Sequence, residues 1–483
     1  MRSNRGALAL IPLDARPCTR AFPVAVGRIA GVDVRVPPPD LLGDLVRPAP
    51  VEDLLDWLEG QAGEVDAAVV ALDTLVYGGL IPARRSDEPI DTLLGRLARV
   101  RELPIPDLYA FCVTMRISDS NVAEEEKSYW AEFGKLIHRW SFSADRYDRT
   151  RDPEAAAAAQ AARSRIPDAI AEDYLATRRR NYAINLKELE LAEQGRFRIL
   201  CVTQDDTSPY GFNQAEKRQI EGRGIENVLV YPGADEVAAV LVARYVNERA
   251  GRVPVFRLQV LPPAGAEVVA MYEDRPLRAT AAGQVRAVGG FLVAEGAGPD
   301  SAVDLVLNAP AGGQGDLALR VDLDRPDTPA RDLAALAARL AAEPPPAFAD
   351  VAYANGADPA LWDRFAASVD PARLAAFAAW NTAGNTIGTV VAAAAAQLAD
   401  EVDRAAQRQF ILDRLADDYL YQVVLRPRLQ AEGRPPAQVA PELASRLEVL
   451  WRERFPHLPI GGIAASFPWS RYFEADVRVL PGS

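Results

Sequence analysis

The sequence predicts an α/β fold with a mostly parallel sheet, arranged like a (β/α)8 barrel with extra strands. Short apolar runs rich in β-branched residues alternate with segments whose apolar residues recur every three or four positions. This order of strand, helix and strand is typical of parallel sheets. Some ten strand-like runs occur, more than the eight of a closed barrel, so an open doubly wound sheet is the alternative.

The expected strands follow one another at intervals that leave room for helices. They lie at 7–13, 32–36, 67–72, 108–115, 197–203, 227–231, 253–260, 302–308, 348–354 and 374–380. Apolar residues at helical spacing predict helices between them, for example over VEDLLDWLEGQ, PIDTLLGRLARVREL and ADEVAAVLVARYVNERAG. Each of these helices can connect two parallel strands.

Four segments divide the chain. Residues 1–119 form the first part of the expected α/β domain, and residues 196–398 form its second part, with a small β excursion at 262–300. Residues 120–195 are polar and alanine-rich, which predicts a helical insertion or lid. Residues 399–483 predict a mainly helical C-terminal extension that closes with a pair of strands.

Composition indicates a globular protein and excludes some partners. Of 483 residues, 49% are apolar and 25% are charged, and the formal net charge is −13. Nucleic-acid binding depends on a basic surface, so a nucleic-acid partner is not expected. The N-terminal apolar stretch of about seven residues ends at Asp14, too short for a signal peptide or a membrane anchor. Nothing in the sequence specifies an oligomeric state.

The cysteines and histidines limit the chemistry. Cys18, Cys112 and Cys201 form no CxxC pair, which fits a reducing compartment, and we expect a cytoplasmic protein. The two histidines, His138 and His457, lie in no motif of a zinc site or a catalytic triad. Any catalysis should therefore use carboxylates, arginines, amides or hydroxyls, and no cofactor is expected.

Polar residues recur directly after the expected strands. In parallel α/β folds ligands bind at the carboxyl ends of the strands, where the connecting loops converge. Each residue taken alone could equally be a helix cap or a turn residue, but the joint pattern favours a site. The candidate residues are Asp14, Arg16, Asp73, Arg116, Asp205, Asp206, Asn355, Asp358, Trp380, Asn381 and Asn385, with Glu124, Glu125 and Glu126 as minor candidates.

The adjacent pair Asp205 and Asp206, in TQDDTSPYG, is the most specific signal. Neighbouring side chains of a strand face opposite ways, so both can approach one ligand only where the strand ends. Two close carboxylates repel, which raises one pKa and leaves an acid beside an anion. Glycoside hydrolysis uses this combination, and it needs no histidine. Asp205 and Asp206 are the predicted catalytic residues.

The segment WNTAGNT, from Trp380 to Thr386, fits a sugar-like ligand. Trp380 can present a flat apolar face to a sugar ring, and Asn381 and Asn385 offer donors and acceptors to hydroxyl or acetamido groups. An equally good interpretation is a helix start with a core tryptophan. The segment predicts a small-molecule or carbohydrate ligand.

The chain resembles a bacterial family catalogued as domain of unknown function 4127. The resemblance rests on six motifs in order over roughly residues 7–425: LIPLDARP, ALDTLVYGGLIPAR, MRISDSNVAEEEKSYW, TQDDTSPYGFNQAE, DVAYANGAD and WNTAGNTIG. This family carries no established activity, so the resemblance implies no mechanism.

A more distant similarity concerns the β-N-acetylglucosaminidases that use the substrate's acetamido group as the nucleophile. The resemblance implies that Asp205 orients that group, that Asp206 protonates the leaving oxygen, and that Asn381 and Asn385 hold the sugar. WNTAGN lacks the acidic residue that follows the tryptophan in those enzymes.

We therefore expect a hydrolase of a sugar-like substrate, and two alternatives remain. Asp14, Asp73, Asp205 and Asp206 could instead hold Mg²⁺ for metal-assisted hydrolysis. The same amides and tryptophan could also serve a carbohydrate-binding protein without catalysis. Fold alone does not decide among these three.

Overall fold

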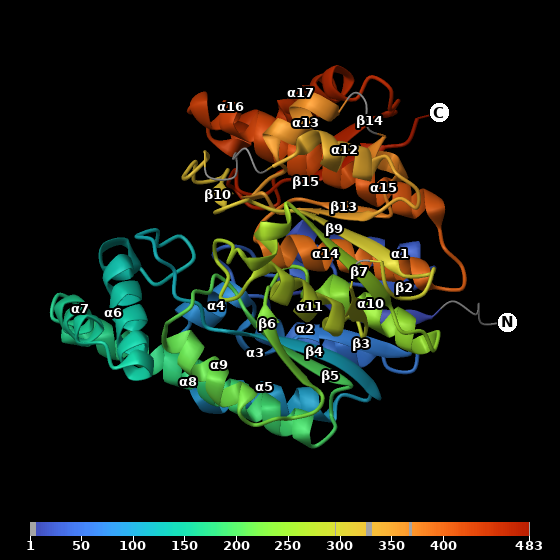
Figure 1. The fold of residues 1–483 in the computed structure, drawn as a ribbon. Coiled ribbons are helices and arrows are strands. Elements are labelled where there is room, and N and C mark those ends of the chain that lie inside the picture. The colour runs from blue at the N-terminus through green and yellow to red at the C-terminus, as the bar shows by residue number, and fades with distance from the viewer. Residues whose placement is uncertain (1–5, 295, 325–330, 367–369, 483) are drawn as a thin grey trace.

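The computed structural model describes residues 6–294, 296–324, 331–366 and 370–482. Its strands confirm the predicted class, an α/β fold with mostly parallel pairing (Figure 1). They are divided between two larger parallel sheets, which we call sheet A and sheet B, and two small two-stranded sheets.

Sheet A has six parallel strands in the order β2-β1-β3-β4-β5-β6. Alternate residues of its strands enter opposite cores, for example Leu8 and Leu10 on one face and Ala9 and Ile11 on the other. Its strands are β1 (Ala7–Ile11), β2 (Asp33–Arg35), β3 (Ala67–Ala71), β4 (Asp107–Thr114), β5 (Ile199–Gln204) and β6 (Val228–Pro232).

Sheet B has five parallel strands in the order β13-β11-β9-β7-β8. Counted along the chain, this order repeats that of the first five strands of sheet A, which is a common order of doubly wound sheets. Its strands are β7 (Val255–Leu261), β8 (Phe291–Val293), β9 (Val303–Asn308), β11 (Ala347–Asp350) and β13 (Ala376–Ala378). The preferred barrel closure gains no support from these two strand orders, and the open-sheet alternative describes them better.

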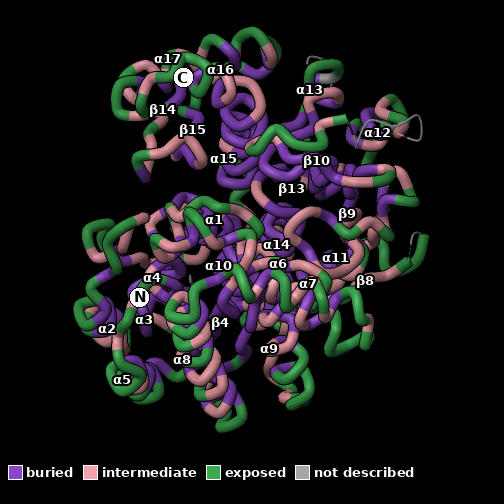
Figure 2. The backbone as a smooth tube through the Cα atoms, turned by 90° about the vertical axis from the view of Figure 1, so that its left-hand side faces the viewer, coloured by how far each residue is buried: buried purple, intermediate pink, exposed green. Residues whose placement is uncertain are grey.

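Helices lie between the sheets and on their outer faces. Between the sheets, α10 packs against α1 and α14, and one core joins these helices to both sheets. The helices of this layer are α1 (Pro17–Ile29), α10 (Val237–Arg249), α11 (Leu277–Ala287) and α14 (Ala383–Ala395). All residues of α14 are buried, which its alanines and glycines permit, since small side chains allow close packing (Figure 2).

The outer face of sheet A is covered by helices from the first half of the chain. Those between β2 and β4 are η1 (Pro39–Leu41), α2 (Val51–Gly60), α3 (Leu72–Tyr77), α4 (Leu80–Arg85) and α5 (Ile90–Glu102). The segment 120–195 is helical as expected, but only α6 (Trp130–Thr150) and α7 (Pro153–Arg163) project from the molecule (Figure 1). Its last helix, α8 (Asp168–Glu193), packs on sheet A, as does α9 (Phe212–Glu221).

The outer face of sheet B is covered mainly by the C-terminal part of the chain. Its helices are α12 (Leu333–Leu340), α13 (Pro359–Phe365), η3 (Pro371–Arg373), α15 (Arg404–Arg414), the π-helix η5 (Leu415–Leu425), α16 (Arg426–Ala431) and α17 (Pro436–Arg454). The short η4 (Ala396–Leu398) follows α14 and contacts α1 and α10 in the layer between the sheets. Two short strands, β10 (Gly315–Asp316) and β12 (Tyr353–Ala354), pair beside this sheet, and η2 (Pro263–Glu267) follows β7. The chain ends in an antiparallel hairpin of β14 (Gly462–Ser466) and β15 (Asp476–Leu480).

None of the helices in the described part of the chain combines the length and the apolarity that a bilayer span requires.

Candidate functional site

The carboxyl ends of the two sheets meet. The Asp235 side chain, just after β6 of sheet A, accepts a hydrogen bond of 2.7 Å from Asn381 Nδ2, just after β13 of sheet B. The Thr207 backbone N–H, after β5, donates to the Tyr272 carbonyl at 2.9 Å. In Figure 1, α4 of the first half and β10 of the second lie on the same side of the sheets. Loops of both sheets therefore share one edge, as the strand-end pattern predicts.

Asp205 and Asp206 lie where β5 ends, and the chain turns sharply there because Asp206 has φ 40°. Arg116, which follows β4, joins the two carboxylates. Its Nη1 donates to Asp206 Oδ2 at 2.7 Å and to Asp205 Oδ2 at 3.3 Å. Arg84 Nη2, from α4, donates to the same Asp205 oxygen at 2.7 Å. Both aspartates thus approach one guanidinium, as their position at a strand end predicts.

The two aspartates differ in their surroundings. Burial and the adjacent Asp205 raise the pKa of Asp206 from 3.8 to about 7, although Arg116 and Arg84 oppose this shift. The ion pair with Arg116 does not cancel the burial, because one guanidinium is shared among several carboxylates. The Asp206 side chain is 27% exposed and that of Asp205 is 14% exposed. Asp206 can therefore hold a proton near neutral pH and exchange it with a ligand.

Two glutamates complete the surroundings of Arg116. Its Nε donates to Glu126 at 2.9 Å and its Nη2 donates to Glu125 at 2.8 Å. Glu125 also accepts a hydrogen bond of 2.7 Å from Arg471, in the loop of the C-terminal hairpin. Burial alone would raise the pKa of Glu125, but the positive charges of Arg116, Arg471 and Arg84 together lower it. The arginines thus fix the acidic residues in place.

A second group of charges lies after β1 and β6. Arg16 binds the Asp14 carboxylate through Nε at 2.9 Å and Nη2 at 2.7 Å. It also binds Asp235, through Nη1 at 3.1 Å and Nη2 at 2.6 Å. Burial raises the pKa of Asp235. The positive charge of Arg16 lowers this pKa, and the negative charges of Asp14 and Asp205 raise it further. The effect of Asp205 shows that this group lies near the aspartate pair.

Sheet B contributes a third group, formed by Tyr272, Asp316 and Asn355. The Tyr272 hydroxyl donates to Asp316 Oδ2 at 2.6 Å, and Asn355 Nδ2 donates to the same oxygen at 2.9 Å. The Asn355 backbone N–H donates to the Asn381 carbonyl at 3.0 Å. Because the Asn355 amide is oriented by Asp316, its Oδ1 is left as an acceptor, and this buried atom has no partner among the described residues.

The hairpin loop, residues 467–475, connects these groups. The guanidinium carbons of Arg16 and Arg471 lie 5.2 and 4.8 Å from the Trp469 ring centroid. Arg471 Nε also binds the two carboxylate oxygens of Glu474 at 2.9 and 3.0 Å. Burial raises the pKa of Glu474 to about 7, although the positive charges of Arg471 and Arg16 lower it. A chain of contacts links Asp206 through Arg116, Glu125, Arg471, Trp469, Arg16, Asp235, Asn381, Asn355 and Asp316 to Tyr272. The Tyr272 carbonyl accepts from the backbone N–H of Thr207, the residue after Asp206, and this hydrogen bond closes the ring.

Backbone strain is concentrated in this ring. Seven non-glycine residues in the described part of the chain have positive φ, and four of them are ring members: Asp206, Tyr272, Asn355 and Asn381. Left-handed conformations of such residues are uncommon and cluster at functional sites. Their concentration here supports a role beyond that of helix caps and turns.

The structure brings together most of the predicted site residues. Arg16, Arg116, Asp206, Asn355 and Asn381 belong to the ring, with the minor candidate Glu125. Asp14 and Asp205 each bind an arginine of the ring, Asp14 through Arg16 and Asp205 through Arg116. Two others lie just behind it. Asn385 Oδ1 accepts from the backbone N–H groups of Ala234 and Asp235, and the Trp380 ring, 7% exposed, packs against Phe473. Trp380 is therefore a core residue in this structure, as the alternative interpretation of WNTAGNT, a helix start with a core tryptophan, predicts.

Asp73 and Asp358 lie outside the ring. Asp73 is buried under the Val113 backbone N–H, and burial with the charge of Glu188 raises its pKa to about 8. Asp358 caps α13 by accepting from Ala360 N at 3.0 Å, and it pairs with Arg331 and Asn308. Their hydrogen bonds fit the capping and turn roles.

The sequence interpretation missed several residues of the ring and Arg84, which binds Asp205 beside it. Asp235 follows β6 in VLVYPGADE, so the strand-end rule could have found it. Arg84 lies in ALDTLVYGGLIPAR without any local signal, and Tyr272 and Asp316 follow β7 and β9 only after long loops. Trp469 and Arg471 reach the site from the far end of the chain, 346 positions from Glu125 in the case of Arg471. No local pattern marks such contacts.

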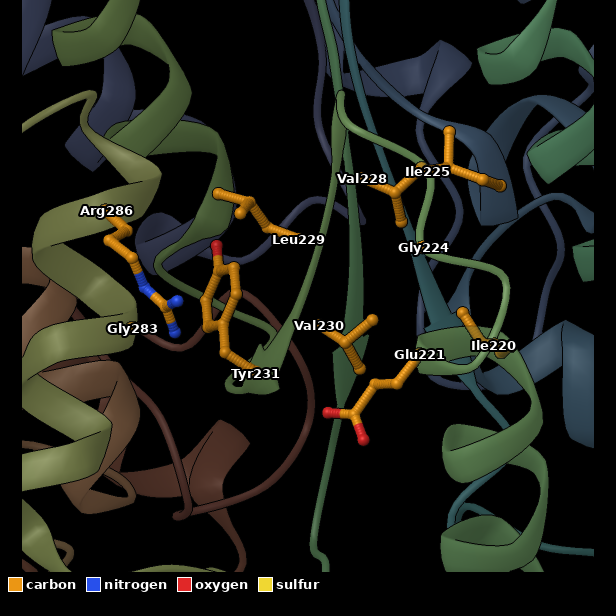
Figure 3. A pocket seen from close by; sticks show the side chains of 10 residues that line it. All are labelled: Ile220, Glu221, Gly224, Ile225, Val228, Leu229, Val230, Tyr231, Gly283 and Arg286. Atoms are coloured by element: carbon orange, nitrogen blue, oxygen red, sulfur yellow. The ribbon is translucent and has the colours of Figure 1, made fainter.

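No three His, Cys, Asp or Glu side chains among the described residues are grouped so that they could hold a metal ion. The magnesium interpretation gains no support from this arrangement, because Asp14, Asp205 and Asp206 bind arginines. A cavity of about 210 Å³ lies elsewhere, at the edge of sheet A along β6 (Figure 3). There Leu229 and Tyr231 point to one side of the strand and Val228 and Val230 to the other.

Fold and site together define an α/β protein of two parallel sheets with a carboxylate and arginine site at their joined edge. The chain belongs to the family described as "Protein of unknown function (DUF4127)", whose model matches residues 8–478 and so nearly the whole chain. No curated protein and no solved structure matches the chain.

Proposed function

We propose that the protein is a carboxylate-based hydrolase of a sugar-like substrate, with Asp206 as the general acid. One observation carries this proposal: the partly exposed Asp206 carboxyl has a pKa near 7 and lies beside Asp205 on a shared arginine. A general acid works best when its pKa is close to the operating pH. No imidazole belongs to the ring of contacts, so Asp206 supplies the proton.

Asp205 takes a different role in this proposal. Arg84 and Arg116 hold its Oδ2, which fixes the carboxylate in one orientation beside the reacting group. For an N-acetylated sugar, Asp205 orients the acetamido group while the carbonyl oxygen of that group attacks the anomeric carbon. Asp206 donates its proton to the leaving oxygen as the glycosidic bond breaks. Water then opens the cyclic intermediate and returns a proton to Asp206.

Amide groups of the second sheet support a polyhydroxylated ligand. Asn381 and Asn355 lie beside Asp235 and Asp316, and the Oδ1 acceptor of Asn355 suits a hydroxyl or amide donor. Trp469 is the aromatic residue of the ring, but it is only 4% exposed and lies against Arg16 and Arg471, so it positions these arginines and does not stack on a sugar.

The test is the hydrolysis of aryl and alkyl N-acetyl-β-glucosaminides by wild type and by Asp206→Asn. Loss of a general acid lowers kcat by about 10²- to 10⁴-fold. We expect a larger loss for the alkyl glycoside than for the 4-nitrophenyl glycoside, because a poor leaving group needs the proton more. Sugar binding, measured by calorimetry with N-acetylglucosamine, should persist in the variant.

Asp107→Asn is the matched control, since Asp107 lies at the opposite end of β4 and its side chain is 51% exposed. Equal losses for both leaving groups would remove Asp206 from the acid role. Activity that disappears with a chelator would favour the metal-dependent alternative. Binding of N-acetylglucosamine without any turnover by wild type would favour the non-catalytic carbohydrate-binding alternative.

A further inference from the structure

A cavity of about 410 Å³ lies between α4 and the loop that precedes α2. Its volume falls within the range of small-molecule sites, about 300–1,000 Å³. Most of its lining is apolar, with Val46, Pro48, Ile81, Pro82 and Tyr77 among the residues. Val46 is 71% exposed, so this apolar side chain of the lining faces solvent. The cavity thus offers apolar surface that remains open to solvent.

The charged side chains of the cavity leave one cation available. Arg96 and Glu88 neutralise each other through a contact of 2.8 Å. Arg85, at the exposed end of α4, makes a long contact of 3.5 Å to the Glu124 carbonyl and no ion pair with a carboxylate among the described residues. The lining is therefore positively charged in a chain whose formal net charge is −13. This favours an anionic group at the Arg85 side.

We propose that this cavity binds a small amphipathic anion, an aliphatic carboxylate whose chain lies on the apolar lining and whose carboxylate binds Arg85. The arrangement follows the common form of small-molecule sites, an apolar wall with a few polar groups that set the orientation. Arginine binds a carboxylate through two parallel hydrogen bonds, which adds orientation to the charge attraction.

The cavity is separate from the carboxylate and arginine site, although α4 contributes to both. Arg84 is 1% exposed and binds Asp205, whereas its neighbour Arg85 and Ile81 line the cavity. The proposal therefore does not depend on the proposed hydrolase activity, and it can fail or succeed independently of it.

The test is the binding of octanoate, octan-1-ol and octylamine to the full chain at low salt by isothermal titration calorimetry. We expect octanoate to bind about tenfold more tightly than octan-1-ol, and octylamine to bind more weakly than both. Arg85→Gln should reduce octanoate affinity to that of octan-1-ol. Val46→Asp, at an exposed position, should weaken octanoate binding by placing a carboxylate beside the cavity.

Arg101→Gln is the control, because Arg101 on α5 is 57% exposed and pairs with Glu102. Unchanged thermal unfolding temperatures show that the variants are folded. Octanoate that does not bind, or binds no better than octan-1-ol, overturns the proposal. So does an octanoate affinity that neither Arg85→Gln nor Val46→Asp changes.

Discussion

Asp206 combines three structural properties. It lies at the end of a central strand, it has a left-handed backbone, and it shares a guanidinium with its chain neighbour. The turn makes the pairing possible, since in a straight strand Asp205 and Asp206 would face opposite sides. The cost of burying the second negative charge appears as a raised pKa, which is the property that a general acid needs.

This pKa predicts a pH-dependent stability difference between wild type and Asp206→Asn. The unfolded chain loses the Asp206 proton near 3.8 and the folded chain near 7, so wild-type stability falls as the pH rises between these values. Asparagine has no proton to lose. We expect the free energy of unfolding of the variant, relative to wild type, to rise by about 1–3 kcal/mol from pH 5 to pH 8.

Urea unfolding at the two pH values measures this difference. The lost Arg116 contact adds an offset that is the same at both values, so the change with pH isolates the titration of Asp206. A difference that stays constant from pH 5 to pH 8 would show that the pKa of Asp206 is not raised.

Single residues were predictable where a local rule applied. The structure places the strand-end residues Arg16, Arg116, Asp206, Asn355 and Asn381 in one ring, and it places Asp14 and Asp205 on two arginines of that ring. The rule also selected Asp358, which caps a helix, because a cap and a ligand group have the same sequence position. Burial and orientation separate the two, and both depend on the tertiary structure.

At the level of elements, the hairpin loop 467–475 closes the ring through side chains. The loop backbone accepts hydrogen bonds from three side chains distant in sequence. Tyr421 donates to the Tyr472 carbonyl, and Gln422 and Arg426 donate to the Phe473 carbonyl. These three residues belong to the π-helix η5 and the start of α16. π-helical turns are rare and often occur at functional sites. The loop is therefore supported by an irregular helix rather than by a sheet.

Weakening this loop should expose Cys18, because Phe473 of the loop packs against the core cluster that contains Cys18. Cys18 is 4% exposed on α1, two positions after Arg16, and burial raises the pKa of its thiol, with Asp235 acting in the same direction. In Arg471→Ala the loop loses its ion pairs to Glu125 and Glu474. We expect iodoacetamide to alkylate Cys18 about tenfold faster in this variant, measured by peptide mass spectrometry.

Cys112 and Cys201 provide internal controls, because they lie inside β4 and β5 and react only when sheet A unfolds. Arg446→Ala is a matched variant, since Arg446 on α17 also pairs with two glutamates but lies outside the loop. If all three cysteines react in parallel in Arg471→Ala, the loop does not move independently of the fold.

For the whole molecule, the repeated strand order places two sets of strand ends at one edge. The alternation of strands and helices predicted parallel pairing, and the observed strands lie close to the expected ranges. The division into two sheets was not predictable from this pattern, since periodicity defines an element but not its partner. The buried, alanine-rich α14 is the physical link, because it packs on α10 between the sheets.

The central claim is that both sheets contribute to one site, and Tyr272→Phe tests it most directly. Tyr272 belongs to sheet B's group, and its hydroxyl, 2.6 Å from Asp316, helps to orient Asn355. The measurement is kcat/KM for 4-nitrophenyl N-acetyl-β-glucosaminide. We expect a loss of about tenfold or more at an unchanged unfolding temperature, because in the proposed site the oriented Asn355 amide binds the substrate to which Asp206 donates its proton. An unchanged kcat/KM, together with an inactive Asp206→Asn, would contradict the claim and confine the site to sheet A.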